Sequence, residues 1–127
     1  MSQVPESASL RNSAEFRSVY AGGKRYEGRF MTVFVLSNGL NRHRLGITAS
    51  RKMAKSAVDR NRAKRLLRES FRLSGAELEG LQHKCDWIFN ARRSLLEVKA
   101  SVPFNEFQEI INRVKLSERL NSDETHL

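Results

Sequence analysis

Apolar residues near the start of the chain recur at helical spacing. Phe16, Val19 and Tyr20 would share one face of a helix, and a pair of glycines follows them. Asn12 and Glu15 have the spacing of a capping box, in which each side chain satisfies a backbone N–H near the other residue. The pattern therefore predicts a short helix that begins after Asn12.

Three later segments have the pattern of β-strands. They span residues 29–36, 44–50 and 85–91. In the first segment, alternation places Met31, Val33 and Val35 on one face of the strand and Phe30, Thr32, Phe34 and Leu36 on the other. In the second, it places Leu45, Ile47 and Ala49 on one face and Gly46, Thr48 and Ser50 on the other. The third segment is apolar almost throughout, which predicts a strand at the centre of a sheet.

The segment from Ser50 to Arg72 combines helical periodicity with a high density of basic residues. Ser56 has capping-box spacing to Asp59, and Gly75 is placed to end the helix. The apolar arc contains Ala63, Leu66, Leu67, Ser70, Phe71 and Leu73, and the opposite arc contains Asn61, Arg62, Lys64, Arg65, Arg68 and Arg72. These features predict a docked amphipathic helix with a cationic outer face, and they exclude a disordered tail.

Arg60 does not fit this division, because helical projection places it near the apolar edge. In the first turn it can instead point off the start of the helix, toward the preceding loop. We therefore keep Arg60 among the candidate ligand-binding residues.

The last apolar pattern, from Pro103 to about Leu116, is again helical. Together the segments predict a single α/β domain over residues 10–116. Residues 1–9 are expected to form a flexible N-terminus, and residues 117–127 a flexible, polar C-terminal tail.

The composition is typical of one globular domain, and the charge distribution indicates the kind of partner that the protein binds. The chain has 127 residues, of which 39% are hydrophobic and 29% charged, and it has no apolar run long enough to span a bilayer. It lacks an apolar signal segment at its start, so the cytoplasm is the expected compartment, and its single cysteine, Cys85, excludes an internal disulfide. The net charge is +9, and 11 of the 23 lysines and arginines lie between Arg42 and Arg72. Such concentration predicts a binding surface for a polyanion, most commonly a nucleic acid.

Residues suited to catalysis are scattered along the chain. His43, His83 and His126 fall in expected loops or in the tail, where a histidine is ordinarily solvated. Asp86 lies near the start of a strand; a buried carboxylate is one alternative, and a position near solvent is the expected one. No catalytic triad, paired carboxylates or metal-ligand spacing is present, so we predict no self-contained active site and no metal held by protein side chains.

Three aromatic residues, Phe16, Tyr20 and Phe34, are of the kind that stack on unpaired bases. A phenylalanine at helical spacing more commonly belongs to a core, and this alternative stays open. The shared face of Phe34 and Thr32, with small hydroxyls on the next predicted strand, favours an RNA-binding cleft.

The stretch "SRKMAKSAVDRNRAKRLLRESFR" resembles the protein subunit of bacterial ribonuclease P. The shared features are a strand that ends in serine, a basic pair, Ala-Val, and Arg-Asn-Arg-x-Lys-Arg at the start of a helix. The segments "EFRSVYAGG", "RLGITAS" and "DWIFNARR" extend the resemblance over roughly residues 10–116. Ala54 stands where the family often has glycine, which leaves the path of that loop open.

The resemblance implies a two-layer α/β sandwich, like the second domain of ribosomal protein S5, with a left-handed βαβ crossover around the basic helix. It also implies a ribonucleoprotein that removes 5′ leaders from precursor tRNA, in which the RNA subunit performs hydrolysis with Mg²⁺ held by RNA and substrate. By position, the residues that would contact the catalytic RNA are Arg60, Asn61, Arg62, Lys64, Arg65 and Arg68. Those that would line the cleft for the single-stranded leader are Phe16, Tyr20, Phe34, Arg51, Lys52, Arg92 and Arg93. Neither a membrane nor an obligate protein partner is expected.

The alternative function is a structural RNA-binding protein, such as a ribosomal component. Composition does not separate the two, but the length of the resemblance favours the ribonuclease P subunit. A protein-only nuclease fits least well, because the chain shows no acid–base or metal constellation.

Overall fold

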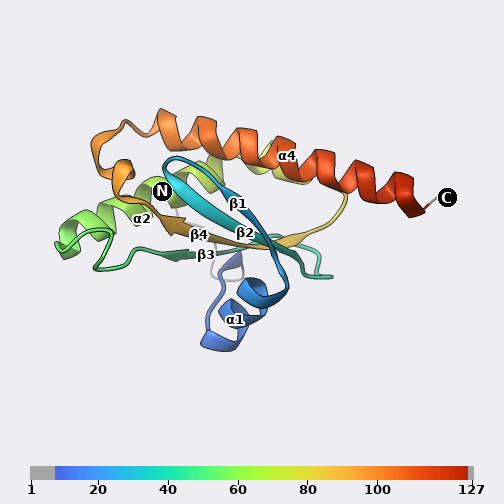
Figure 1. Cartoon of the computed structure of the whole chain (residues 1–127), viewed down its shortest axis with the longest axis horizontal. Helices are drawn as coiled ribbons and strands as arrows, with labels where there is room; N and C mark the ends of the chain where they lie inside the picture. The colour runs from blue at the N-terminus through green and yellow to red at the C-terminus, as the bar shows by residue number, and fades with distance from the viewer. Residues whose placement is uncertain (1–7, 126–127) are drawn as a thin grey trace.

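The computed structural model describes residues 8–125, and Figure 1 shows a four-stranded sheet with helices on both faces. The first half of the chain forms α1 (Ser13–Gly22), β1 (Lys24–Glu27), β2 (Met31–Ser37) and β3 (Arg44–Thr48). The second half forms α2 (Ala57–Leu73), α3 (Gly75–Glu79), β4 (Cys85–Ala91), a short 3-10 helix η2 (Arg93–Glu97) and α4 (Ser101–Thr125).

The strands lie in the order β1-β2-β4-β3. β2 is antiparallel to β1 and β4, whereas β3 is parallel to β4. α2 lies in the connection between β3 and β4, so the basic helix forms the crossover between two parallel neighbours. The expected α/β class, the mixed sheet and the central position of residues 85–91 are confirmed.

The main core lies between the sheet and the layer that α2 and α4 form (Figure 1). Trp87 and Phe89 of β4 are fully buried and contact Phe107 of α4 edge to face, with ring centroids 5.4 and 4.7 Å apart. Ala63 and Leu67 provide the buried stripe of α2. A smaller cluster on the opposite face of the sheet lies under α1; it contains Leu10, Val19 and Ile88, with Phe16, Phe34 and Leu36 packed against it. The basic helix is therefore docked, as its periodicity predicts.

The edge strand β1 is absent from the sequence prediction. Only Tyr26 of its four residues is buried, and the others are exposed. A strand that buries one side chain has no alternating pattern to recognise, although its register with β2 is regular.

The end of α2 also differs from the prediction. Ser74 caps α2, and Gly75 is the first residue of α3 and has no left-handed φ. Leu73, expected on the buried arc, is 50% exposed. It follows Phe71 by two residues, which turns it about 200° around the helix axis and away from the core.

α4 continues to Thr125, through residues that were expected to form a tail. The Glu118 carboxylate accepts hydrogen bonds from the backbone N–H groups of Gln82 (2.9 Å) and His83 (3.2 Å). These bonds hold this part of the helix against the loop that precedes β4. Of the flexible N-terminus predicted at residues 1–9, residues 1–7 lie outside the described residues, whereas Ser9 forms a bridge to Leu45 of β3.

The N-terminal half of α4 fixes the turn before β2. The carboxylate of Glu106 accepts from the backbone N–H groups of Arg29 (2.7 Å), Phe30 (2.9 Å) and Met31 (3.1 Å). A Cβ at Gly28 would lie 2.8 Å from the backbone carbonyl oxygen of Met31 and 2.3 Å from this carboxylate, so the close approach requires glycine. The start of β2 is thereby held against α4. None of the helices within residues 8–125 has an apolar stretch sufficient to cross a bilayer.

Candidate nucleic-acid interface

Strand register aligns polar side chains across the sheet face beside α1. Thr32 of β2, Asn90 of β4 and Thr48 of β3 form one row, which we call the polar row. Within it, the Asn90 Oδ1 atom accepts a hydrogen bond from the Thr48 hydroxyl at 2.7 Å. Thr32 is buried, whereas Asn90 and Thr48 are half-buried and retain contact with solvent. The sequence prediction that Phe34, Thr32 and Thr48 share one face is therefore confirmed.

The aromatic candidates lie next to the polar row. The Tyr20 hydroxyl donates to Asn90 Oδ1 at 2.9 Å, and its ring contacts Phe34 edge to face with centroids 4.8 Å apart. The Tyr20 side chain is 38% exposed, while Phe34 is half-buried and lies 6.0 Å from the Arg25 guanidinium. Phe16 lies over Gly46, where a Cβ would come within 2.5 Å of its ring. Tyr20 is thus the most accessible ring of the three, and Phe16 and Phe34 also serve the smaller core.

Four cationic candidates follow the two parallel strands. Arg51 and Lys52 come shortly after β3, and Arg92 and Arg93 come directly after β4. Because the carboxyl ends of parallel neighbours meet at the same edge of a sheet, topology brings these residues together. All four are exposed. We call this group the basic edge; it adjoins the polar row, whose Asn90 and Thr48 are near the carboxyl ends of the same strands.

The basic candidates on α2 divide into two groups. Arg60 turns toward the preceding loop, as predicted, but its Nη1 atom donates to the carbonyls of Ala54 (2.9 Å) and Lys55 (2.7 Å). Arg62 Nη1 donates to the Leu96 carbonyl at 3.0 Å, which joins α2 to η2. These two arginines therefore hold protein segments in place, in addition to any contact with RNA. Ala54 is buried in the main core and has no left-handed φ.

Asn61, Arg65 and Arg68 are exposed on α2, and Lys64 is half-buried. Arg68 lines a pocket of about 180 Å³ together with Phe16 and Gly46. Residues expected to meet two different RNAs, Arg68 and Phe16, therefore lie on the walls of the same pocket. The two surfaces are continuous around the β3 edge of the sheet.

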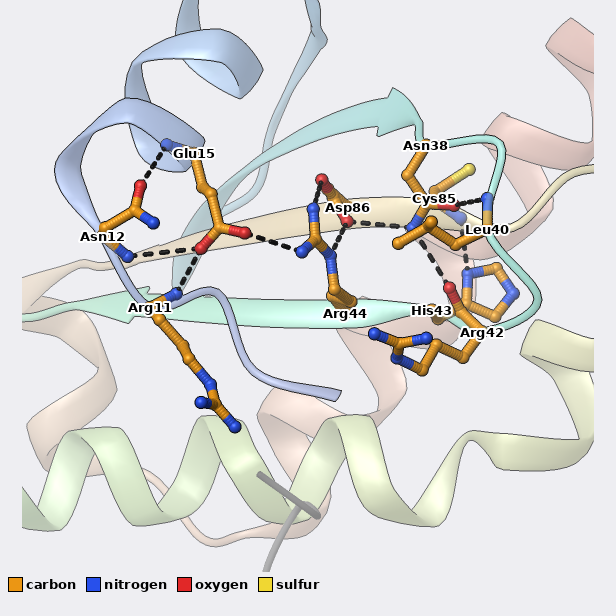
Figure 2. A network of polar contacts seen from close by, with 10 residues as sticks. All are labelled: Arg11, Asn12, Glu15, Asn38, Leu40, Arg42, His43, Arg44, Cys85 and Asp86. Atoms are coloured by element: carbon orange, nitrogen blue, oxygen red, sulfur yellow. Dashed lines mark hydrogen bonds and ion pairs between the residues drawn. The ribbon is translucent and has the colours of Figure 1, made fainter. Parts of the chain in front are cut away.

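An ion-pair network fixes α1 on this face of the sheet (Figure 2). Arg44 of β3 donates from Nε and Nη2 to the two oxygens of Asp86, both at 2.7 Å, and from Nη1 to Glu15 of α1 at 2.7 Å. Asn38 also donates to Asp86 at 2.9 Å. Asp86 is buried, so the expectation that it lies near solvent is wrong; its bidentate arginine partner offsets the cost of burying the charge.

Electrostatics reinforce this network. The hydrogen bonds to Asp86 raise the pKa of the Arg44 guanidinium above its ordinary value. The pKa of Glu15 is lowered, first by the backbone N–H of Arg11 and further by Arg44. Glu15 also completes the predicted capping box with Asn12. Each charged form is thus stabilised by its partner at neutral pH.

His43 is buried and structural, contrary to the expected solvated loop residue. Its Nδ1 atom accepts from the Cys85 backbone N–H (3.0 Å) and from Trp87 Nε1 (3.1 Å), which leaves Nε2 to donate to the Leu78 carbonyl (3.0 Å). Burial lowers the pKa of His43 and raises that of the Cys85 thiol to about 12. Within the described residues no group of three or more His, Cys, Asp or Glu side chains is arranged to hold a metal ion.

Sequence reasoning missed Asn90 as a member of this surface. The sequence does contain a signal for it, which is an amide side chain near the end of an otherwise apolar strand. Burying a polar side chain there costs free energy unless the side chain has a hydrogen-bond partner. Its partners lie 42 and 70 positions away in the sequence, so only the fold shows what it contacts.

The comparisons with known proteins relate this chain to one protein family. The family model described as Ribonuclease P matches residues 4–115. A ribonuclease P protein component from Caldanaerobacter subterraneus subsp. tengcongensis is 36% identical over 109 residues, which cover 86% of this chain and 90% of the relative. One from Clostridium kluyveri is 39% identical over 98 residues, covering 73% of this chain and 86% of the relative.

Solved structures agree with the sequence comparisons. The chain is similar to the ribonuclease P protein of Staphylococcus aureus, with a TM-score of 0.72 and 26% identity over 85% of this chain and 95% of that one. It is similar to the protein from Thermotoga maritima with a TM-score of 0.71 and 26% identity over 82% of this chain and 94% of that one. Both similarities cover more than four fifths of this chain.

Proposed function

The chain belongs to the ribonuclease P protein family and is a protein subunit of that ribonucleoprotein, and we propose that within it the RNA hydrolyses precursor tRNA while this protein holds the 5′ leader. Association with the ribonuclease P RNA and a role in tRNA processing follow from the family. The proposal adds which surface meets which RNA, and which subunit performs the chemistry. It also places the protein in the cytoplasm, together with the precursor tRNA.

The observation that carries the leader site is the junction of the polar row with the basic edge, beside Tyr20. Single-stranded RNA is bound by cations along its phosphates and by stacking and hydrogen bonds at its bases. The leader's bases lie against Tyr20, Asn90 and Thr48, and its phosphates continue to Arg51, Lys52, Arg92 and Arg93. Phe16 and Phe34 support this surface from the smaller core.

The catalytic RNA meets the outer arc of α2. Arg65 and Arg68 are exposed arginines whose planar guanidinium groups suit bidentate contact with phosphate oxygens, and Asn61 and Lys64 lie on the same arc. Arg60 and Arg62 use only Nη1 for the protein bonds described above. Their remaining guanidinium nitrogens are directed to the same RNA.

Hydrolysis is assigned to the RNA with Mg²⁺ held by RNA and substrate phosphates. The acid–base groups near the sheet face support this division, because each is already engaged. Asp86 and Glu15 accept from Arg44, and both ring nitrogens of His43 are used in the protein. A group held in this way is poorly placed to exchange protons with a substrate.

The test is a cleavage assay with precursor tRNA at low Mg²⁺. Protein alone, cognate ribonuclease P RNA alone and the assembled pair are compared. We expect cleavage by the assembled pair and none by the protein alone, because neutralised phosphate repulsion allows the two RNAs to associate at low metal concentration. Cleavage by protein alone would contradict the assignment of hydrolysis to RNA.

A further inference from the structure

We propose that the groove between β1 and the C-terminal half of α4 is a docking site for an acidic protein segment, which binds in an extended conformation along the edge of β1. This surface is separate from both proposed RNA surfaces. β1 lies at one edge of the sheet, whereas the basic edge follows β3 and β4 and the Arg68 pocket adjoins β3, at the other side. RNA bound at those surfaces therefore leaves the groove open.

The groove has a volume of about 270 Å³ and follows the strand. β1 contributes Lys24, Arg25 and Tyr26 to its walls, and α4 contributes Arg113, Leu116 and Leu120. Successive side chains of a strand point to opposite faces of the sheet, so three successive residues line one groove where that groove opens along the strand edge. The backbone of β1 is therefore part of the surface that a ligand would meet.

This backbone can accept another strand. β1 pairs with β2 over all four of its residues, and within residues 8–125 no strand lies on its other side. In an antiparallel pair, alternate residues direct their N–H and C=O groups away from the partner, and at a sheet edge these groups can bond an added strand. An extended segment that pairs in this way would direct every second side chain toward α4.

The face of α4 that lines the groove is apolar and exposed. Leu116 is 55% exposed and Leu120 is 56% exposed. They are four positions apart, so they are neighbours on one face of the helix. Apolar side chains at alternate positions of the docked segment would cover these leucines and remove their surface from water.

The charge at the groove is positive. Arg113 and Lys24 both lie over the Tyr26 ring, with the guanidinium carbon 5.1 Å and the ammonium nitrogen 5.4 Å from its centroid. Lys24 also donates to the Ser117 hydroxyl at 3.1 Å, which links β1 to α4. None of the residues that line the groove is acidic. The two cations are thus held beside the apolar wall, where they complement carboxylates of a ligand.

Other occupants fit this groove less well. Tyr26 is only 4% exposed, so its ring offers no open face on which an unpaired RNA base could stack. A second copy of the chain would bring together two molecules that each carry a net charge of +9. Glu27, the one acid of β1, is paired with Arg25. An acidic segment with apolar residues at alternate positions therefore fits best.

The experiment measures binding of a fluorescent synthetic peptide of about eight residues, in which valine and glutamate alternate, to the assembled holoenzyme by anisotropy at physiological salt. Leu120→Glu and Arg113→Glu should each weaken binding about threefold to tenfold, because each removes one part of the groove and adds a like charge. Leu120→Glu changes an exposed helical position, so it tests the groove even if Arg113→Glu disturbs the contact with Tyr26.

Each variant has a matched control. Leu73→Glu makes the same change at a leucine of α2 that is 50% exposed, and Lys115→Glu makes the same change of charge at an exposed residue of α4 that does not line the groove. Both should leave the affinity for the peptide within about twofold of wild type. A peptide with proline in place of its central valine lacks one backbone donor and should bind more weakly than the original.

Several results would overturn the proposal. The wild-type holoenzyme may fail to bind the peptide, or the controls may weaken binding as much as the groove variants do. Equal affinity for the proline peptide would exclude strand addition. Displacement of the peptide by a short oligouridylate would make the groove an RNA site. Dimerisation of the protein that Leu120→Glu abolishes would make it an interface between two copies.

Discussion

His43 shows how one residue couples the stability of the fold to pH. Its neutral ring accepts two N–H bonds at Nδ1 and donates one at Nε2. Protonation would place a hydrogen on Nδ1 and break both accepted bonds. Burial also disfavours the charged ring, so the pKa of His43 lies below its ordinary value of 6.5.

We predict that the free energy of unfolding falls as the pH drops below about 6.5. The unfolded chain then binds a proton that the folded chain excludes, so the stability that neutral His43 contributes is complete above this pH and lost below it. The slope from one such proton reaches about 1.4 kcal/mol per pH unit. Urea titrations between pH 5 and 7.5 measure it, and His43→Gln should remove it.

The control for this prediction is the exposed His83. His83→Gln should leave the pH dependence of unfolding unchanged, because the His83 side chain is exposed to solvent and is not enclosed by the fold. If His83→Gln and His43→Gln change the slope equally, the burial of His43 is not its cause.

At the scale of elements, the placement of α1 decides whether the leader surface exists. α1 is held near its start by the ion pair of Glu15 with Arg44 and by the close packing of Phe16 on Gly46. Tyr20, which reaches Asn90, belongs to the same helix. A shift of α1 would therefore move the aromatic residues away from the polar row together.

Gly46→Ala tests this placement. The added Cβ would lie 2.5 Å from the Phe16 ring and 3.1 Å from Leu10, so α1 must move or the ring must rotate. We expect a loss of about 1–3 kcal/mol in stability, as overpacking generally costs. We also expect weaker holoenzyme binding of precursor tRNA relative to mature tRNA, both measurable in equilibrium titrations.

Gly75→Ala is the matched control, because a Cβ at Gly75 meets nothing within 4 Å and its φ is ordinary. It should leave RNA binding unchanged and stabilise the fold by about 0.4–1 kcal/mol, since alanine loses less backbone entropy on folding. Equal precursor-to-mature discrimination by Gly46→Ala and wild type would show that the leader does not depend on α1.

The elements themselves are largely predictable from the sequence because their periodicity is strong. The capping box of Asn12, the alternation around Val33 and the stripe of Ala63 and Leu67 all repeat a pattern that the fold uses locally. β1 could not be predicted from the sequence, because its single buried residue, Tyr26, does not produce an alternating pattern. The burial of Asp86 could not be predicted either, because it depends on an ion pair with Arg44, which lies 42 residues earlier in the chain.

For the whole molecule, the topology of the fold determines where the basic residues gather on the surface. Parallel pairing of β3 with β4 gathers the basic edge, whose members are about 40 positions apart in the sequence. The outer arc of α2 carries a second group, and the pocket shared by Arg68 and Phe16 connects the two. Spacing along the chain predicts the arc of α2, but the basic edge follows only from the direction of the strands.

We predict that the position of a charge on this molecule matters more for RNA assembly than the net charge. Arg65→Gln with Arg68→Gln lowers the net charge from +9 to +7 (9 − 2), and so does Lys115→Gln with Arg119→Gln on α4. All four side chains are exposed. Only the first pair lies on the arc proposed to face the catalytic RNA, so only that pair should change the phosphates that the protein neutralises.

The measurement is the affinity for ribonuclease P RNA across a series of salt concentrations. Each phosphate contact adds somewhat less than one unit to the slope of log affinity against log salt, so losing Arg65 and Arg68 should make the slope shallower by about 1–2 units. The α4 pair should lower affinity slightly through the long-range field while keeping the slope. Equal slopes for the two double variants would mean that α2 does not contact RNA phosphates, and that net charge alone drives assembly.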